Sequence, residues 1–275
     1  MSERMVTANG VPLCVETFGD PADPALLLIH GAQASMLWWE EELCSLLAAG
    51  GRYVVRYDQR DTGRSVSYPV GEPPYAMSDL ARDAVGVLDA LGIDRAHVVG
   101  RSMNGGTALF LGVDHPERVA TLTFVTTTTG EVEDGGDVAE EPGGAPTEPA
   151  KPATVVDELV EAIRECAGRS PYFDEAAVRT RAERDVARAT DMAASLTNHF
   201  AMRFDEPKGG GWGDLAAPAL VVQGELDPYF PPKHGEALAA AIPDAELLVL
   251  EDVGHDVPPE SWDVFVPALL RHTHR

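Results

Sequence analysis

The first part of the chain alternates short apolar runs with polar turns. Two runs of alternating apolar residues, 4–8 and 11–18, flank Asn9-Gly10, which predicts a β-hairpin with a two-residue turn. Longer apolar runs, of the kind that form strands buried on both faces of a sheet, follow at 25–31, 53–58, 96–100 and 118–126.

Segments of helical periodicity lie between these runs, at 36–50, 78–91 and about 102–113. For the second of them, Ser78 is the expected N-cap and Gly92 the expected stop. Strands that alternate with helices in this way form βαβ units, so we predict an α/β fold with a mostly parallel central sheet flanked by helices.

The alternation stops at residue 126 and resumes near 215. Residues 130–152 are Gly, Pro and acidic residues with almost no apolar side chain, which predicts a flexible loop, and 154–205 have helical character. Strand, helix, strand and closing helix then follow at 218–227, 233–242, 245–255 and up to about 271. We therefore predict a core formed by 1–126 and 215–275 and a helical cap insertion at 127–214.

The segment HVVGRSMNGG (97–106) contains the strongest candidate for a reactive side chain. An apolar strand runs into Gly100, and a helix begins just after Ser102. A serine on such a sharp strand-to-helix turn exposes its oxygen above the sheet, where the helix N-terminus favours a developing negative charge. The alternative is a serine that only caps the helix. The expected pattern is G-x-S-x-G, and Asn104 stands in place of its last glycine.

Two later residues favour the reactive interpretation. Asp227 follows one apolar strand in GELDP, and His255 follows the next in DVGHD. The carboxyl ends of parallel strands meet at one edge of a sheet, which brings both residues toward Ser102 in the chain order of a Ser-Asp-His triad. Histidine would take the serine proton, and the carboxylate would orient the histidine. Glu225 is the alternative acid.

An oxyanion hole is expected from two backbone amides, those of Met103 and of Ala32 in the loop after the third apolar run. His30 is more simply a histidine that supports this loop than a catalytic one. The segment YDQRDTGRS (57–65) offers either a carboxylate pair or a loop locked by Arg–carboxylate bridges, and we favour the bridges. Of Trp38 and Trp39, one is expected to face the core and the other to line the pocket.

Charge and cysteine content narrow the function classes. The formal net charge of −24 disfavours nucleic acid and anionic membranes and attracts cations such as amine-bearing small molecules, although it also serves solubility alone. Cys14, Cys44 and Cys166 fit neither a metal site nor a disulfide framework, so we expect a cytoplasmic protein with reduced thiols and no metal or cofactor. No apolar run is long enough to span a bilayer.

Several stretches carry a resemblance to a known family: FGDPADPALLL (18–28), RYDQRDTGRS (56–65), DAVGVLDALGIDRAHVVGRSM (83–103) and the loops of Asp227 and His255. The chain resembles the α/β-hydrolase family and, within it, the aclacinomycin methylesterase group of actinobacterial polyketide pathways. The resemblance implies that Ser102, Asp227 and His255 form the triad and that the amides of Ala32 and Met103 form the oxyanion hole. The sequence departs from the family pattern at four positions: Ala32 and Asn104, where glycine is usual, and the charged Arg101 and Asp256.

We therefore expect a serine carboxylic ester hydrolase that acts through an acyl-enzyme. The expected substrate is a bulky natural-product ester, such as a polyketide methyl ester or a macrolide lactone, cationic where it bears an amino sugar, in biosynthesis or antibiotic inactivation. The alternatives are a cofactor-free perhydrolase or haloperoxidase-like enzyme and a non-catalytic binding protein with the same fold. Substrate contacts are predicted for Trp38, Trp39, Phe200, Phe204 and Tyr229.

Overall fold

The computed structural model describes residues 3–130 and 152–274. The strands are β1 Arg4–Ala8, β2 Val11–Phe18, β3 Ala25–Ile29, β4 Tyr53–Tyr57, β5 Ala96–Arg101, β6 Val119–Val125, β7 Ala219–Gly224 and β8 Ala245–Leu250. The helices are α1 Glu41–Ala49, α2 Met77–Leu91, α3 Asn104–Asp114, α4 Pro152–Ala167, α5 Glu175–Arg188, α6 Met192–Ala201, α7 Pro232–Ala241 and α8 Trp262–His272. Four short 3-10 turns are η1 Met36–Trp38, η2 Pro116–Arg118, η3 Trp212–Asp214 and η4 Pro259–Ser261.

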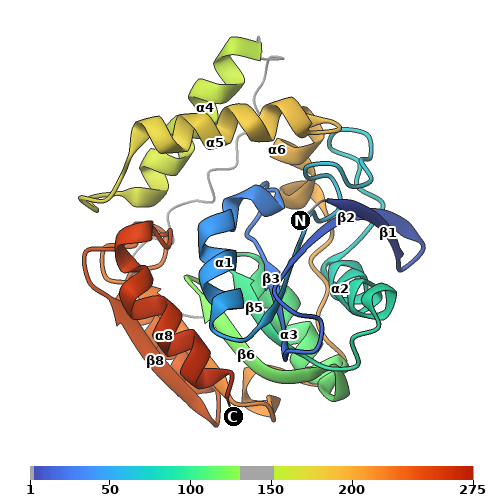
Figure 1. The fold of residues 1–275 in the computed structure, drawn as a ribbon, viewed down its shortest axis with the longest axis vertical. Helices are drawn as coiled ribbons and strands as arrows, with labels where there is room; N and C mark the ends of the chain where they lie inside the picture. Colours follow the sequence, from blue (N-terminus) through green and yellow to red (C-terminus); the bar gives the residue numbers. More distant parts are fainter. Residues whose placement is uncertain (1–2, 131–151, 275) are drawn as a thin grey trace.

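One sheet holds all eight of these strands, in the order β1-β2-β4-β3-β5-β6-β7-β8 (Figure 1). β2 pairs antiparallel with β1 and β4, and every other neighbouring pair is parallel. The β1–β2 hairpin turns at Asn9 and Gly10, whose φ angles of 48° and 79° are the left-handed values that a two-residue turn of this type requires. The predicted hairpin and the predicted mostly parallel sheet are both confirmed.

Both faces of the sheet are covered, which explains the continuous apolar runs. Along β3, Leu26 and Leu28 pack with side chains of α1 and α8, whereas Leu27 and Ile29 pack with side chains of α2, α3 and α7. Successive side chains of a strand point to opposite faces, so a strand between two helical layers needs apolar residues at every position. The sheet is thereby fixed as a rigid base for the loops at its edge.

The structure corrects two predictions about helices. The single helix expected at 36–50 is instead η1 followed by α1, because Trp39 is extended and the Arg56 side chain donates hydrogen bonds to the carbonyls of Met36 and Trp39. Ser78 is not the N-cap of α2: Ala76 takes that position, and its N–H donates to the Asp79 carboxylate at 2.9 Å. Gly92 does end α2, with a left-handed φ of 69°.

Helices α4, α5 and α6 lie between β6 and β7 in the sequence, and α4 and α5 run together at one end of the molecule (Figure 1). This segment contacts loops that follow sheet strands. The N–H of Thr190, between α5 and α6, donates to the Gly63 carbonyl at 2.7 Å, and the backbone N–H of His255 donates to the carbonyl of Cys166 in α4 at 2.8 Å. The predicted flexible loop at 130–152 lies, except for its two end residues, outside the described residues. Within the described ranges, no helix has the length and apolar character needed to cross a membrane.

Candidate active site

Ser102 occupies a tight turn between β5 and α3. Its φ of 51° is in the left-handed region, and its N–H donates to the Val125 carbonyl at 2.9 Å. The turn brings strand and helix so close that a Cβ at Gly100 would lie 2.3 Å from the carbonyl oxygen of Asn104. Backbone strain of this kind exposes the serine side chain above the sheet edge.

A hydrogen-bonded chain links the three side chains predicted as a triad. Ser102 Oγ lies 3.0 Å from His255 Nε2, and His255 Nδ1 lies 2.8 Å from Asp227 Oδ2. The other carboxylate oxygen of Asp227 accepts hydrogen bonds from the amides of Tyr229 and Phe230, each at 2.9 Å. These contacts fix the carboxylate, which in turn holds the ring of His255 toward Ser102.

The alternative acid, Glu225, points elsewhere. Its side chain accepts a hydrogen bond from the Asp252 amide at 3.1 Å, and the residue is exposed, whereas Asp227 is buried. The structure therefore brings Asp227 rather than Glu225 to His255.

Two aromatic rings enclose the imidazole of His255 edge-on. The ring centroids of Tyr229 and Phe230 lie 5.2 Å and 5.4 Å from that of His255. Such rings restrict water around the histidine and limit its side-chain motion. Tyr229 was predicted to lie near the site, but Phe230 was missed. Its position directly after Tyr229, in the loop that follows the acid, was the available signal.

The two predicted oxyanion amides lie on loops that meet at Ser102. The loop after β3 passes so close that a Cβ at Gly31 would lie 3.1 Å from the Cβ of Ser102. Within residues 3–130 and 152–274, the amides of Ala32 and Met103 donate to no acceptor. Free amides beside a nucleophile are the donors that stabilise a developing oxyanion.

Helix α6 anchors this loop through Gln33. The Gln33 amide donates to His199 Nδ1 at 3.0 Å, and its side chain donates to the Leu196 carbonyl at 2.6 Å. Its carbonyl accepts a hydrogen bond from the Ser195 hydroxyl at 3.0 Å. Burial lowers the pKa of His199, which favours the neutral ring that this acceptor role requires. None of these contacts was predicted, because His199 and Gln33 stand 166 positions apart.

His30 supports the same loop from the core side. Its ring packs edge-on against Trp39 at 5.3 Å, and its Nδ1 lies 2.8 Å from the amide nitrogen of Gly31. Burial, reinforced by the charge of Arg101, holds the pKa of His30 well below its ordinary value. A neutral, fully packed histidine of this kind fits the structural role favoured for it.

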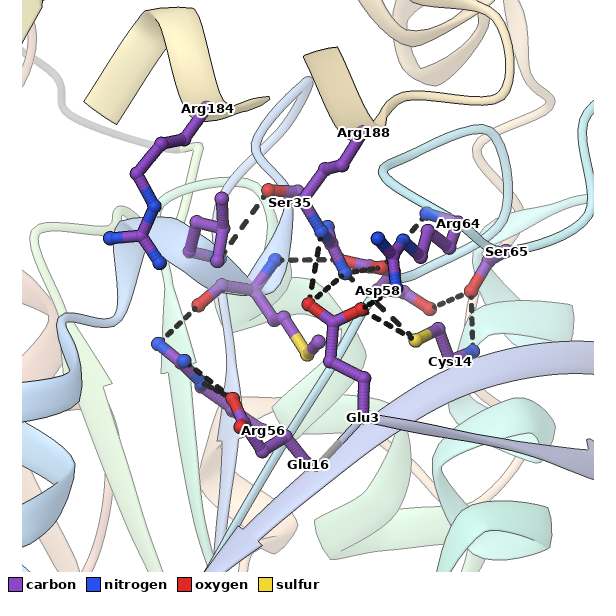
Figure 2. A network of polar contacts seen from close by, with 12 residues as sticks. Glu3, Cys14, Glu16, Ser35, Arg56, Asp58, Arg64, Ser65, Arg184 and Arg188 are labelled. Carbon is purple, nitrogen blue, oxygen red and sulfur yellow. Dashed lines mark hydrogen bonds and ion pairs between the residues drawn. The ribbon is translucent and has the colours of Figure 1, made fainter. Parts of the chain in front are cut away.

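The segment YDQRDTGRS (57–65) is locked by Arg–carboxylate bridges, as predicted, but their partners come from other parts of the fold. Arg60 pairs with Asp83 of α2 at 2.5 Å. Asp58 pairs with Arg188 of α5 at 2.7 Å (Figure 2). Both pairs are buried. No carboxylate pair with a chemical role is needed to explain this segment.

The remaining predicted substrate contacts are spread over the molecule. Trp39 is 2% exposed in the core, and Trp38 packs against α4 and α5 and donates to Asp185 at 2.7 Å. Phe200 and Phe204 are 42% and 57% exposed. Tyr229 is the member of the set that touches a residue of the hydrogen-bonded chain.

A cavity of about 110 Å³ lies between helices α4 and α5 and the loop that carries His255. Its walls include Ile163 of α4, Phe173, Val178 of α5, and the two sequence neighbours of His255, Gly254 and Asp256. Among the residues that the structure describes, no group of His, Cys, Asp and Glu could hold a metal ion.

The sequence pattern of the alpha/beta hydrolase fold family matches residues 24–261. The chain belongs to the α/β-hydrolase family. It is 33% identical to the rhodomycin D methylesterases of Streptomyces sp. (strain C5) and Streptomyces peucetius, over 99% of its own length and 98% of theirs. Its fold is similar to that of the enol-lactonase from Burkholderia xenovorans LB400, with a TM-score of 0.79, 25% identity, and coverage of 99% of this chain and 100% of that one.

These similarities confirm two predictions. The resemblance to the aclacinomycin methylesterase group is confirmed by the two rhodomycin D methylesterases, and the α/β hydrolase is a carboxylic ester hydrolase.

Proposed function

We propose that this α/β hydrolase cleaves esters with Ser102 as nucleophile, His255 as general base and acid, and Asp227 as the group that orients the histidine. The observation that carries the proposal is the continuous chain from Ser102 Oγ to His255 at 3.0 Å and from His255 to Asp227 at 2.8 Å. A serine hydroxyl is a weak nucleophile until a base takes its proton, and this geometry supplies the base.

The reaction follows from the positions of the groups. Ser102 Oγ attacks the ester carbonyl while His255 Nε2 takes the hydroxyl proton, and the amides of Ala32 and Met103 stabilise the oxyanion. His255 then protonates the leaving alcohol, which leaves an acyl group on Ser102. Water, activated by the same histidine, releases the acid and restores the serine.

A fluorophosphonate probe tests whether Ser102 is the activated nucleophile. The wild-type protein is expected to label at Ser102, as mapped by peptide mass spectrometry, and Ser102→Ala is expected not to label. Ser45→Ala, which removes an exposed hydroxyl on α1, is the matched control and should label like wild type. A wild-type protein that does not label would support a non-catalytic binding protein.

We further propose that the substrate is a bulky natural-product ester, such as a polyketide methyl ester or a macrolide lactone. The full-length similarity to enzymes named for the methyl ester of rhodomycin D supports this class. The net charge of −24 favours substrates that carry an amine, in biosynthesis or in antibiotic inactivation. Cys14, Cys44 and Cys166 are all free thiols, which suits the cytoplasmic location that we expect for this protein.

Salt dependence tests the charge argument. For an amine-bearing anthracycline or macrolide ester, kcat/KM should fall as salt rises from 20 to 500 mM (about tenfold or less), because screening weakens long-range attraction. A neutral p-nitrophenyl ester is the control and should show no such trend. Equal dependence for both substrates would leave the acidity as a solubility feature.

We propose that residues 127–214 form the cap that selects the substrate. The contacts of α6 with Gln33 and of α4 with His255 support this, because α6 and α4 lie against both loops of the site. Phe204→Ala should weaken the hydrolysis of bulky esters more than of small ones if Phe204 contacts substrate. If the hydrolysis of bulky and of small esters falls by the same factor, specificity lies with other residues, of which Tyr229 is the first to examine.

A further inference from the structure

We infer that Arg101 is a positioning residue for His255, an inference that rests on the proposed role of His255 as the base. Arg101 directly precedes the nucleophile and is 5% exposed. Its guanidinium donates to the backbone carbonyl of His255 at 2.5 Å, pairs with Asp256 at 2.9 Å and lies 2.7 Å from His30 Nε2.

These contacts connect two loops to the end of a strand. His30 belongs to the loop after β3, Arg101 is the last residue of β5 directly before the serine turn, and His255 and Asp256 belong to the loop after β8. A guanidinium presents several donors in a rigid plane and can reach all three partners at once, whereas the single ammonium of lysine cannot. Arg101 therefore fixes the distance between the serine turn and the histidine loop.

The backbone of His255 is held on both of its polar groups. Its N–H donates to the Cys166 carbonyl at 2.8 Å, and its carbonyl accepts from Arg101 and, at 3.4 Å, from the Thr126 hydroxyl. Without Arg101, the carbonyl keeps only the longer of its two hydrogen bonds. A shift of about 1 Å between nucleophile and base can cost about 100-fold in rate, so this anchoring matters for turnover.

Arg101 also balances the charge of Asp256, the residue after His255. The two side chains pair at 2.9 Å, so their charges compensate each other. Removal of Arg101 leaves an unpaired carboxylate on the residue after His255, which favours the imidazolium form of the ring; removal of Asp256 leaves an unpaired cation, which disfavours that form. The other charged or titratable groups around the ring and around Asp256 stay in every variant: Asp227, Tyr229, His30, Cys166, and the paired Glu40 and Arg181.

The opposite signs give the test. We measure pH profiles of kcat and kcat/KM for wild type, Arg101→Met, Asp256→Asn and the double variant. Arg101→Met should lower plateau kcat about 10- to 100-fold. It should also shift the acid limb of the kcat/KM profile, where activity falls on acidification, to higher pH by about one unit. Asp256→Asn should shift the acid limb to lower pH and should reduce kcat less than Arg101→Met does. The double variant should return the limb toward wild type while kcat stays low.

If Arg101→Met does not fold, Arg101→Lys keeps the test decisive, because lysine preserves the positive charge but lacks the planar set of donors of the guanidinium. Its limb should stay in place while kcat falls. If the variants change only the melting temperature, and kcat and the acid limb match wild type, Arg101 is a structural residue and the inference is wrong. Loss of activity in Ser102→Ala alongside that result would leave the proposed function standing, whereas an active Ser102→Ala would overturn the function itself.

Discussion

The side-chain amide of Asn104 donates a hydrogen bond of 2.6 Å to the carbonyl oxygen of His30. Asn104 is fully buried, and its side-chain oxygen Oδ1 accepts a hydrogen bond from the Thr107 hydroxyl at 2.6 Å. Gln59 donates to the same His30 carbonyl at 3.0 Å. The residue that replaces the last glycine of the serine motif therefore ties the serine turn to the loop that carries Ala32.

Asn104→Ala tests the importance of this tie. The substitution removes the oxygen acceptor of the Thr107 hydroxyl, which keeps only the weaker acceptor Met77 Sδ at 3.2 Å, and it leaves the His30 carbonyl with one donor fewer. We therefore expect a loss of about 1–3 kcal/mol in the free energy of unfolding. Because the loop of Ala32 is loosened, kcat should fall as well, measured on a p-nitrophenyl ester. Wild-type values of both kcat and unfolding free energy would show that the hydrogen bond is dispensable.

A second prediction concerns the junction between α5 and the core. Arg188 contacts Asp58 through two hydrogen bonds, of 3.0 Å and 2.7 Å, and also reaches Glu3 (Figure 2). The side chains of Arg188 and Asp58 are only 7% and 0% exposed. Arg188→Met leaves a buried carboxylate uncompensated, so urea denaturation should show a loss of about 3–5 kcal/mol.

Arg184→Met is the matched control for Arg188→Met on the same helix. Arg184 pairs with Glu41 at 2.7 Å, but the two side chains are 58% and 50% exposed, so its loss should cost less than about 1 kcal/mol. Equal losses for the two variants would show that burial does not set the strength of the α5 contacts.

A third prediction concerns stability in acid. His97 is buried in β5 beside the Thr121 hydroxyl at 3.0 Å, and burial, with the charge of Arg52, lowers its pKa from 6.5 to about 4. Between these values the unfolded chain binds more protons than the folded protein, so stability falls as pH falls. From pH 7 to 4.5, His97 should account for a loss of about 2 kcal/mol.

Chemical denaturation of wild type and His97→Asn at both pH values measures this contribution. The variant should lose about 2 kcal/mol less than wild type on acidification, whatever its stability at pH 7. The buried His30 and His199, whose pKa values are also lowered, are present in both proteins and cancel in the comparison. The same acid-induced loss in both proteins would contradict the assignment to His97.

The elements and the hydrogen-bonded chain of the site could be predicted because their determinants are local. Each buried strand is a continuous apolar run, and parallel strands place the residues that follow them at one edge, which brought Ser102, Asp227 and His255 together. The break in the predicted helix at 36–50 could not be foreseen, because it depends on Arg56, a side chain of β4.

The supporting contacts of the site were missed for a related reason. Asn104 and His30 are 74 positions apart, Arg101 and His255 are 154 apart, and each pair meets only after the sheet has assembled. From the sequence, Asn104 and Arg101 were visible only as departures from a family pattern. Their hydrogen bonds explain how the departures fit the fold, and such pairings are determined by tertiary structure rather than by spacing along the chain.

The steady-state rate of Ser102→Ala tests the central claim most directly. A serine-histidine unit contributes about 10⁶-fold to kcat in the best-studied hydrolase, so hydrolysis of a p-nitrophenyl ester by Ser102→Ala should fall by at least about 10⁴-fold. Circular dichroism and melting temperature should match wild type, and Ser45→Ala should retain full activity. A Ser102→Ala protein that keeps its fold and hydrolyses the ester within tenfold of the wild-type rate would contradict the mechanism proposed for this hydrolase.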